Sequence, residues 1–229
     1  MAKKPCLSFV GSRACSSYGL NTKHLILEMA GAEPELVIIS GMTKDIDTVA
    51  HESALETGMK TFAILAGRLN HLYPPENKHL ATRIQKEGAL ITEFPMAVKP
   101  MAKHSSIRDQ VISGLSIGVV VNEARLKSGA KTTAAFALKQ NLEVFALPGR
   151  VDSESSEGTN RLISRQHAKL ITNSDDILKE LHIGKTKTKD SQLPLFKARK
   201  LMKLNEFSEL EKTVIKNIDK GTRISMTFM

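Results

Sequence analysis

Four short polar segments stand at the ends of apolar runs, and they pair glycine with lysine or arginine. Glycine allows close approach of the backbone N–H groups to a ligand, and the neighbouring cation adds positive charge. This combination is suited to binding an anion such as a phosphate. The segments are Gly-Ser-Arg at 11–13, Ser-Gly-Met-Thr-Lys at 40–44, Lys-Ser-Gly at 127–129 and Pro-Gly-Arg at 148–150.

The elements that position these segments alternate between short apolar runs and helical patterns. This alternation predicts an α/β fold with a mostly parallel sheet and helices on both faces. In such a sheet, the loops that leave the carboxyl ends of the strands converge on one crevice, where we expect an anionic ligand. The predicted strands are 6–10, 36–39, 61–65, 89–91, 118–121, 143–147 and 168–171, and the predicted helices are 20–30, 46–56, 77–86, 131–140 and 174–181.

The basic character of the 229-residue chain is concentrated in its last part. The formal net charge is +9, and residues 184–229 contribute an excess of six cations to it. A basic balance fits nucleic acid, and it fits a domain with a flexible basic tail equally well. No apolar stretch reaches the length that spans a bilayer, and the two cysteines form no framework. We therefore expect a cytoplasmic protein without a membrane anchor.

The domain organisation follows from where the alternating pattern stops. Residues 1–183 are predicted to form the α/β domain, and 184–204 a basic linker. Residues 205–229 are predicted to form a short helical appendage, in which Ser208 and Glu211 make a capping box. Its apolar face consists of Phe207, Leu210, Val214, Ile215 and Ile218.

Catalytic and metal-binding arrangements are not supported by the sequence. Gly-Leu-Ser-Ile-Gly at 114–118 matches the nucleophile-elbow string, but here a helix precedes Ser116 and a strand follows it, which reverses the required order. Glu93 and Glu123 follow strands, yet no base, nucleophile and orienting group assemble around them. The histidines lack metal-ligand spacing, and His51 is predicted to be a packed residue. We predict no enzyme activity, no metal and no cofactor.

The loop at 127–133 resembles the second half of a phosphate-binding P-loop, but Ala130 separates the glycine from the lysine. The loop opens a helix, and the backbone N–H groups around Gly129 with the hydroxyls of Ser128, Thr132 or Thr133 could hold one phosphate. Alternatively, Ser128 could serve only as the helix cap; the sequence leaves both open. Arg13 and Lys44 should both overhang the crevice. Asp47 is predicted to cap the following helix.

Taken in order, nine strings resemble the DNA-processing protein A (DprA, also called Smf) family over roughly residues 6–181. Tyr-Pro-Pro-Glu-Asn at 73–77 and Leu-Lys-Ser-Gly at 126–129 are the most specific of them. The others are Gly-Ser-Arg at 11–13, the segment 40–47, Ala-His at 50–51, Glu-Phe-Pro at 93–95, Glu-Ala at 123–124, Pro-Gly at 148–149 and Gly-Thr-Asn-Arg-Leu-Ile at 158–163.

This resemblance implies an extended Rossmann-like domain that binds single-stranded DNA without hydrolysing it. It also implies a homodimer that protects incoming DNA and delivers RecA recombinase to it during natural transformation, competence and DNA recombination. The helical domain that many relatives carry before this core is expected to be absent. Residues 205–229 are expected to be the remnant of a winged-helix domain.

The chain departs from the family pattern in the segments that line the DNA pocket. Where the family usually has Arg then Gly, this chain has Lys44 then Asp45. Where the family reads Phe-Pro-x-Arg-Asn-Arg, residues 105–110 read Ser-Ser-Ile-Arg-Asp-Gln. These changes remove one arginine and add a carboxylate, so we expect weaker phosphate binding.

The sequence thus predicts a binding site for single-stranded DNA in which cations hold phosphates and glycines permit close approach. The alternative is a small nucleotide or nucleoside-phosphate binding protein or enzyme that uses the same crevice, with Asp45, Asp109 and Gln110 contacting ribose or base. A third hypothesis is a decayed pocket in a protein that serves as a dimeric partner of RecA. The predicted DNA-binding residues are Ser12, Arg13, Gly41, Lys44, Arg108, Gln110, Lys127, Ser128 and Gly129.

Overall fold

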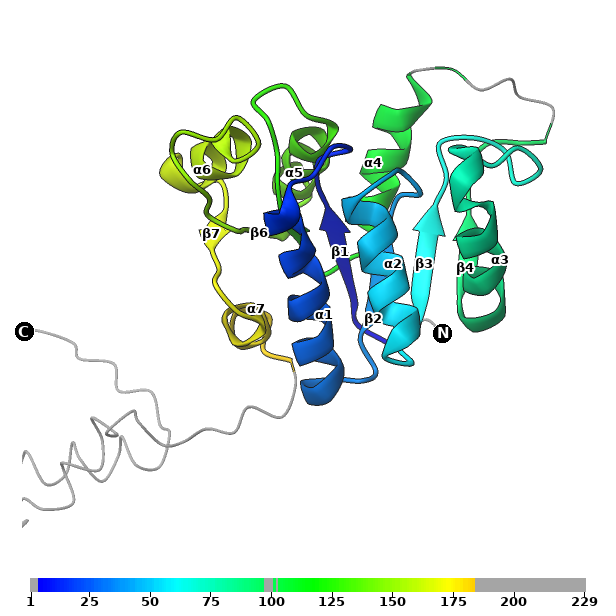
Figure 1. The fold of residues 1–229 in the computed structure, drawn as a ribbon, viewed down its shortest axis with the longest axis horizontal. Coiled ribbons are helices and arrows are strands. Elements are labelled where there is room, and N and C mark those ends of the chain that lie inside the picture. The colour runs from blue at the N-terminus through cyan, green and yellow to red at the C-terminus, as the bar shows by residue number, and fades with distance from the viewer. Residues whose placement is uncertain (1–3, 97–100, 102, 184–229) are drawn as a thin grey trace, which may run out of the picture. The chain divides into compact units, whose positions relative to one another are not determined.

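The computed structural model describes residues 4–96, 101 and 103–183, which form a parallel sheet of seven strands with helices on both faces (Figure 1). The strand order is β4-β3-β2-β1-β5-β6-β7. This is the Rossmann order with one more strand, β4, beside β3. The predicted α/β class and extended Rossmann-like fold are confirmed. The strands are β1 (Cys6–Val10), β2 (Val37–Ser40), β3 (Thr61–Ile64), β4 (Ala89–Ile91), β5 (Gly118–Val121), β6 (Glu143–Ala146) and β7 (Lys169–Leu170).

Every predicted strand is present, and each end agrees within one residue. The five predicted helices are also present, as α1, α2, α3, α5 and α7. Two further helices, α4 and α6, and two short 3-10 turns complete the described elements. The helices are α1 (Asn21–Ala32), α2 (Ile46–Glu56), α3 (Lys78–Glu87), α4 (His104–Gly114), α5 (Gly129–Lys139), α6 (Glu157–Ser164) and α7 (Ser174–Glu180), and the turns are η1 (Ser17–Leu20) and η2 (Pro75–Asn77).

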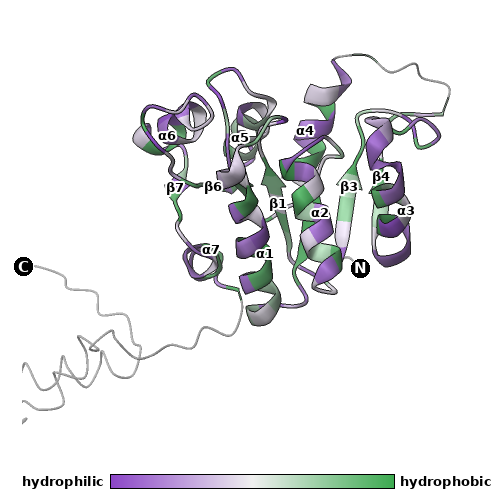
Figure 2. Cartoon of the chain, in the orientation of Figure 1, coloured by the Kyte–Doolittle hydropathy of each residue, from purple (hydrophilic) through white to green (hydrophobic). Residues whose placement is uncertain are grey.

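The central strands are largely apolar on both faces because both faces are covered. Successive residues of β5 show this directly: Val120 packs in the core beneath α1 and α2, whereas Val119 and Val121 pack in the core beneath α4 and α5. Buried parallel strands therefore appear as continuous apolar runs. In Figure 2 the strands are mainly apolar, whereas the helices carry both hydrophilic and apolar residues.

The predicted linker at 184–204 and the predicted helix at 205–229 lie outside the described residues. Among the residues that are described, no helix has the length and apolar character needed to cross a membrane.

Candidate functional site

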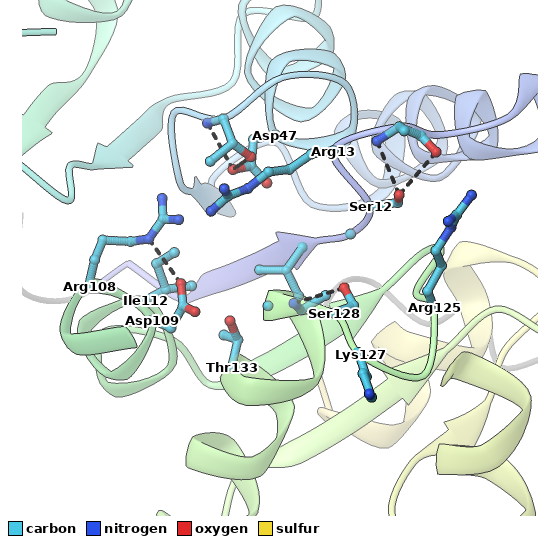
Figure 3. Close-up of a pocket in the computed structure, with 16 residues that line it drawn as sticks. Ser12, Arg13, Asp47, Arg108, Asp109, Ile112, Arg125, Lys127, Ser128 and Thr133 are labelled. Atoms are coloured by element: carbon cyan, nitrogen blue, oxygen red, sulfur yellow. Dashed lines mark hydrogen bonds and ion pairs between the residues drawn. The ribbon is translucent and has the colours of Figure 1, made fainter. Parts of the chain in front are cut away.

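A crevice opens where the order of the strands reverses. From β1 the chain crosses to β2 on one side, whereas β5, the other neighbour of β1, is followed by β6 on the opposite side. The loops after β1 and β5 therefore diverge, which is where open α/β sheets bind ligands. The crevice has a volume of about 500 Å³ (Figure 3). Its walls are residues 10–14, Thr43, Asp47, Arg108, Asp109, Ile112, Arg125, residues 127–130 and Thr133.

Six of the nine predicted binding residues line this crevice. They come from three separate segments: the loop after β1, the helix α4 and the loop that leads from β5 into α5. These residues are Ser12, Arg13, Arg108, Lys127, Ser128 and Gly129.

The other three predicted residues do not line the crevice. Lys44 lies on the exposed surface, where its Nζ is 2.7 Å from Oε1 of Glu76. Gln110 is exposed on α4. Gly41 is buried directly after β2, and a Cβ at this position would overlap the guanidinium of Arg108. The absence of a side chain at Gly41 therefore makes room for Arg108, and the roles of these three residues in binding stay predictions.

Arg108 forms a buried ion pair with its neighbour Asp109. Nε of Arg108 donates to Oδ1 of Asp109 at 2.9 Å, and Nη1 donates to the carbonyl of Ile64 at 3.3 Å. Burial raises the pKa of the Asp109 carboxyl, and the positive charge of Arg108 acts against this rise. The pair thus places both a cation and a carboxylate in the crevice, which Asp47 also lines.

The amino end of α5 also opens onto the crevice through Ser128, Gly129, Ala130 and Thr133. Ser128 is the N-cap of α5, since its Oγ accepts a hydrogen bond from the N–H of Ala130 at 3.3 Å. The capping interpretation of Ser128 is therefore confirmed. A helix amino end attracts anions whether or not its cap is occupied, so phosphate binding here stays a prediction.

Asp47 was predicted to cap α2, and that prediction is wrong. Oδ2 of Asp47 instead accepts from the N–H and the Oγ1 of Thr43, at 3.0 and 2.6 Å. The residue at the N-cap position is Asp45, and Asp47 lies inside the first turn, from which it reaches back to the loop. Asp47 therefore fixes the loop between β2 and α2.

Asp45 has a backbone conformation that favours glycine, with φ of 63° and ψ of −109°. Its side chain makes no cap hydrogen bond, so replacing it by glycine removes no such bond. Relief of strain should exceed the added entropy of the unfolded chain, and Asp45→Gly is expected to raise the free energy of unfolding by about 1 kcal/mol. Thermal denaturation would measure the gain, as an increase in Tm of about 2–4 °C.

Asn141→Gly is the matched control, because Asn141 also has a positive φ, 56°. Asparagine tolerates this conformation better than most residues, so the control should gain less. An Asp45→Gly protein no more stable than the original would contradict the interpretation of strain at this position.

Two buried polar residues near the crevice have structural roles. Nε2 of His51 lies 2.6 Å from the carbonyl of Gly41, and Nδ1 lies 2.7 Å from Oγ1 of Thr61. Burial lowers the pKa of His51. Since a carbonyl only accepts, the neutral ring carries its proton on Nε2. The packed, hydrogen-bonded role predicted for His51 is confirmed.

Glu123 connects three segments at the carboxyl edge of the sheet. Its carboxylate accepts from the N–H and Oγ of Ser16, at 2.9 and 2.7 Å, and from Oγ of Ser155 at 3.0 Å. Glu123 therefore fastens the loops after β1 and β6 to the end of β5 and does not line the crevice. Glu93 is exposed after β4.

Ser116 lies between α4 and β5, in the helix–serine–strand order expected from the sequence. Its Oγ donates to the carbonyl of Ile112 at 2.9 Å and contacts Oγ of Ser8. In the ranges that the structure describes, no three histidine, cysteine, aspartate or glutamate side chains are grouped as a metal site requires.

The predicted binding residues left out one cation of the crevice, Arg125. Arg125 and Thr133 line it, and Thr43 borders both the crevice and a second cavity of about 540 Å³. This cavity also shares Arg13 and Arg108 with the crevice. Arg125 carried a usable signal, since it follows β5 by four residues and precedes the Lys-Ser-Gly segment. Thr43 belongs to the segment 40–44, and Thr133 was named with the loop that could hold a phosphate, so both lie where the sequence indicated a ligand.

Residues 1–182 match the family model of DNA recombination-mediator protein A. The DNA processing protein DprA of Streptococcus pneumoniae strain R6 is 38% identical over 180 residues, which is 79% of this chain and 63% of that protein. Protein Smf of Escherichia coli K12 is 43% identical over 179 residues, 78% of this chain and 47% of that protein. The chain thus spans about half to two thirds of these relatives.

The solved structures that this chain resembles include DNA processing proteins, as its sequence relatives do. DNA processing protein A of S. pneumoniae superposes with a TM-score of 0.71 at 38% identity, covering 78% of this chain and 62% of that one. DNA processing protein A of Helicobacter pylori, whose structure was described for its single-stranded DNA binding mode, gives 0.70 at 28% identity and covers 78% and 80%. A molybdenum cofactor binding protein of Rippkaea orientalis gives 0.56 at 15% identity, which shows a shared fold alone.

Proposed function

The chain belongs to the DNA recombination-mediator protein A family, and on that premise we propose that it binds single-stranded DNA in the crevice between β1 and β5. The observation that carries this proposal is the convergence of Arg13, Arg108, Arg125 and Lys127 with the amino end of α5 on one cavity. The H. pylori relative, described for single-stranded DNA binding, supports the ligand class.

Each part of the site has a distinct task in this proposal. Arg13 and Lys127 are exposed at the mouth and neutralise phosphates. Arg108 is buried and held by Asp109, so it presents a fixed charge. Ser12, Ser128 and Gly129 bring hydroxyl and N–H groups to the phosphate oxygens.

The departures from the family pattern fit weak binding. Lys44 must leave Glu76 before it can meet a phosphate, and Asp109 opposes an anion in the crevice. Gln110 supplies no charge where relatives have arginine. Fewer phosphate contacts lower both the affinity and its dependence on salt.

We propose further that the protein acts as a homodimer in the cytoplasm, protects incoming strands and loads RecA recombinase onto them, and that it is not an enzyme. Family membership supports these assignments. The two free cysteines, Cys6 and Cys15, suit a reducing compartment.

Fluorescence anisotropy of a labelled single-stranded oligonucleotide across a salt series tests the proposal. We expect the logarithm of the affinity to fall linearly with the logarithm of the salt concentration. The slope should be about 0.7 for each phosphate contact. Unlabelled single strands should compete better than duplex DNA of the same sequence. Absence of binding at low salt would overturn the proposal.

The second candidate function is binding of a small nucleotide. The carboxylate of Asp109 inside the crevice favours it, because a carboxylate accepts hydrogen bonds from ribose hydroxyls or base N–H groups. A mononucleotide would then displace the oligonucleotide at a modest salt slope. A strand-binding site should instead prefer longer oligonucleotides.

A further inference from the structure

Asp109 brings a carboxylate into the crevice that is proposed to bind phosphate. Only 6% of the residue is exposed, and its carboxyl lines the crevice together with Arg108, Ile112 and Thr133 (Figure 3). Oδ1 accepts from Nε of Arg108, on the same helix. Oδ2 lies about 4.0 Å from where a Cβ on Gly129 would be, so it faces the start of α5. A phosphate drawn to that helix end would therefore come close to Oδ2.

The charges around Asp109 come from every element that surrounds it. Arg108 is on its own helix, Asp47 is on α2 and Arg13 is on the loop after β1, and the loop after β5 adds Arg125 and Lys127 to the same crevice. Burial is the largest influence and raises the pKa of Asp109; Arg108 and Arg13 oppose the rise, whereas Asp47 adds to it. In the free protein, the carboxyl of Asp109 therefore binds a proton more readily than the carboxyl of an aspartate in water does.

A bound phosphate adds one more negative charge beside the carboxyl. Two anions in one desolvated site repel each other, and protonation of one removes the repulsion. The neutral carboxyl also gains an O–H donor, which a phosphate oxygen accepts. Arg108, released from part of its attraction to Asp109, retains its full charge for the ligand.

We propose that Asp109 is a binding residue that takes up a proton from solvent when the strand binds, and that it donates this proton in a hydrogen bond to a phosphate oxygen. The inference rests on the proposed function, because it names a device within that same crevice.

The direction of the pH dependence follows from linkage. The carboxyl has a higher pKa in the complex than in the free protein, so affinity is greatest at low pH, where the carboxyl is neutral in both states. As the pH rises through the interval between the two pKa values, affinity falls by up to about tenfold per pH unit. Above both pKa values, the affinity stays constant at its lowest level.

Asp109→Asn tests the inference, because asparagine preserves the shape and the acceptor for Arg108. Oligonucleotide affinity would be measured by anisotropy from about pH 5 to about pH 8 at constant ionic strength. We expect the original protein and Asp109→Asn to bind alike at the acid end and to diverge as the pH rises. At the alkaline end the variant should bind about tenfold more tightly.

Glu87→Gln is the matched control, since it removes the same charge at the exposed end of α3, away from the crevice. It should follow the original protein at every pH. The difference between the curves of the original protein and Asp109→Asn, with the control unchanged, therefore isolates Asp109.

Calorimetry on the unchanged protein provides a second test that depends on no variant. The binding enthalpy measured in two buffers of different ionisation enthalpy gives the number of protons taken up, and we expect a value approaching one near the middle of the interval. Strand binding with parallel pH curves and no proton uptake would overturn the role of Asp109 and leave the proposed function intact. Failure to bind at any pH would overturn both.

Discussion

Replacing Arg13 and Lys127 together by alanine is expected to weaken binding of a single-stranded oligonucleotide by at least about thirtyfold at low salt. Each cation should contribute about 1–3 kcal/mol through charge-assisted hydrogen bonds to phosphate. Both side chains are exposed, and neither forms a hydrogen bond or ion pair within the described part of the chain. The weaker binding should therefore reflect the ligand and leave folding unchanged.

The salt dependence distinguishes the removal of phosphate-binding cations from a general change in charge. The double variant should reduce the slope of log affinity against log salt by about 0.7 for each phosphate that is no longer neutralised. Lys60→Ala with Lys86→Ala removes the same charge from exposed positions before β3 and near the end of α3. An unchanged affinity and slope in the Arg13 and Lys127 variant, or an equal effect in the control, would refute the proposed site.

A second large effect is expected from Gly158→Ala, which acts on stability. Gly158 is buried in the first turn of α6, and its N–H donates to the carbonyl of Ala124 at 2.7 Å. An added Cβ would lie 2.5 Å from that oxygen and 2.6 Å from the carbonyl oxygen of Arg125. Both obstacles are backbone atoms, so we expect a loss of about 2–3 kcal/mol in the free energy of unfolding.

Chemical denaturation would measure this loss, and the corresponding fall in Tm is about 5–10 °C. Gly31→Ala is the control, since Gly31 is exposed in α1 and a Cβ there meets no atom within 4 Å. That change should stabilise the helix by about 0.5–1 kcal/mol. If both alanine variants behaved alike, close approach at Gly158 would not be the reason for the glycine.

The sheet could be predicted from the sequence because its strands are mostly apolar runs bounded by glycine or polar residues. Helices α4 and α6 were harder to predict. In α4, serines interrupt the apolar stripe, so that only its end near Leu115 was expected. In α6, Gly158, Thr159 and Asn160 are poor helix formers. The contact between Gly158 and Ala124 helps hold this helix, and a tertiary contact of that kind leaves no local pattern.

The positions of candidate-site residues could be predicted where the order of the strands alone determines them. Arg13 and Lys127 follow β1 and β5, which any parallel sheet of this order brings together. Side-chain direction was not predictable. Gln110 follows Arg108 by two residues, about 200° around the helix, so the two side chains point to different sides. Lys44 meets Glu76, 32 residues away in the sequence, through a contact that spacing cannot reveal.

The central position of β1 has a consequence for the order in which this protein can be built. β1 pairs with β2 nearby in sequence, but its other neighbour, β5, begins more than a hundred residues later. During synthesis, β1 therefore remains an open sheet edge until β5 has emerged, and long-range pairing of this kind is slow. The nascent chain thus passes through a stage with an apolar edge that invites aggregation. Occupancy of the crevice becomes possible only when that edge has closed.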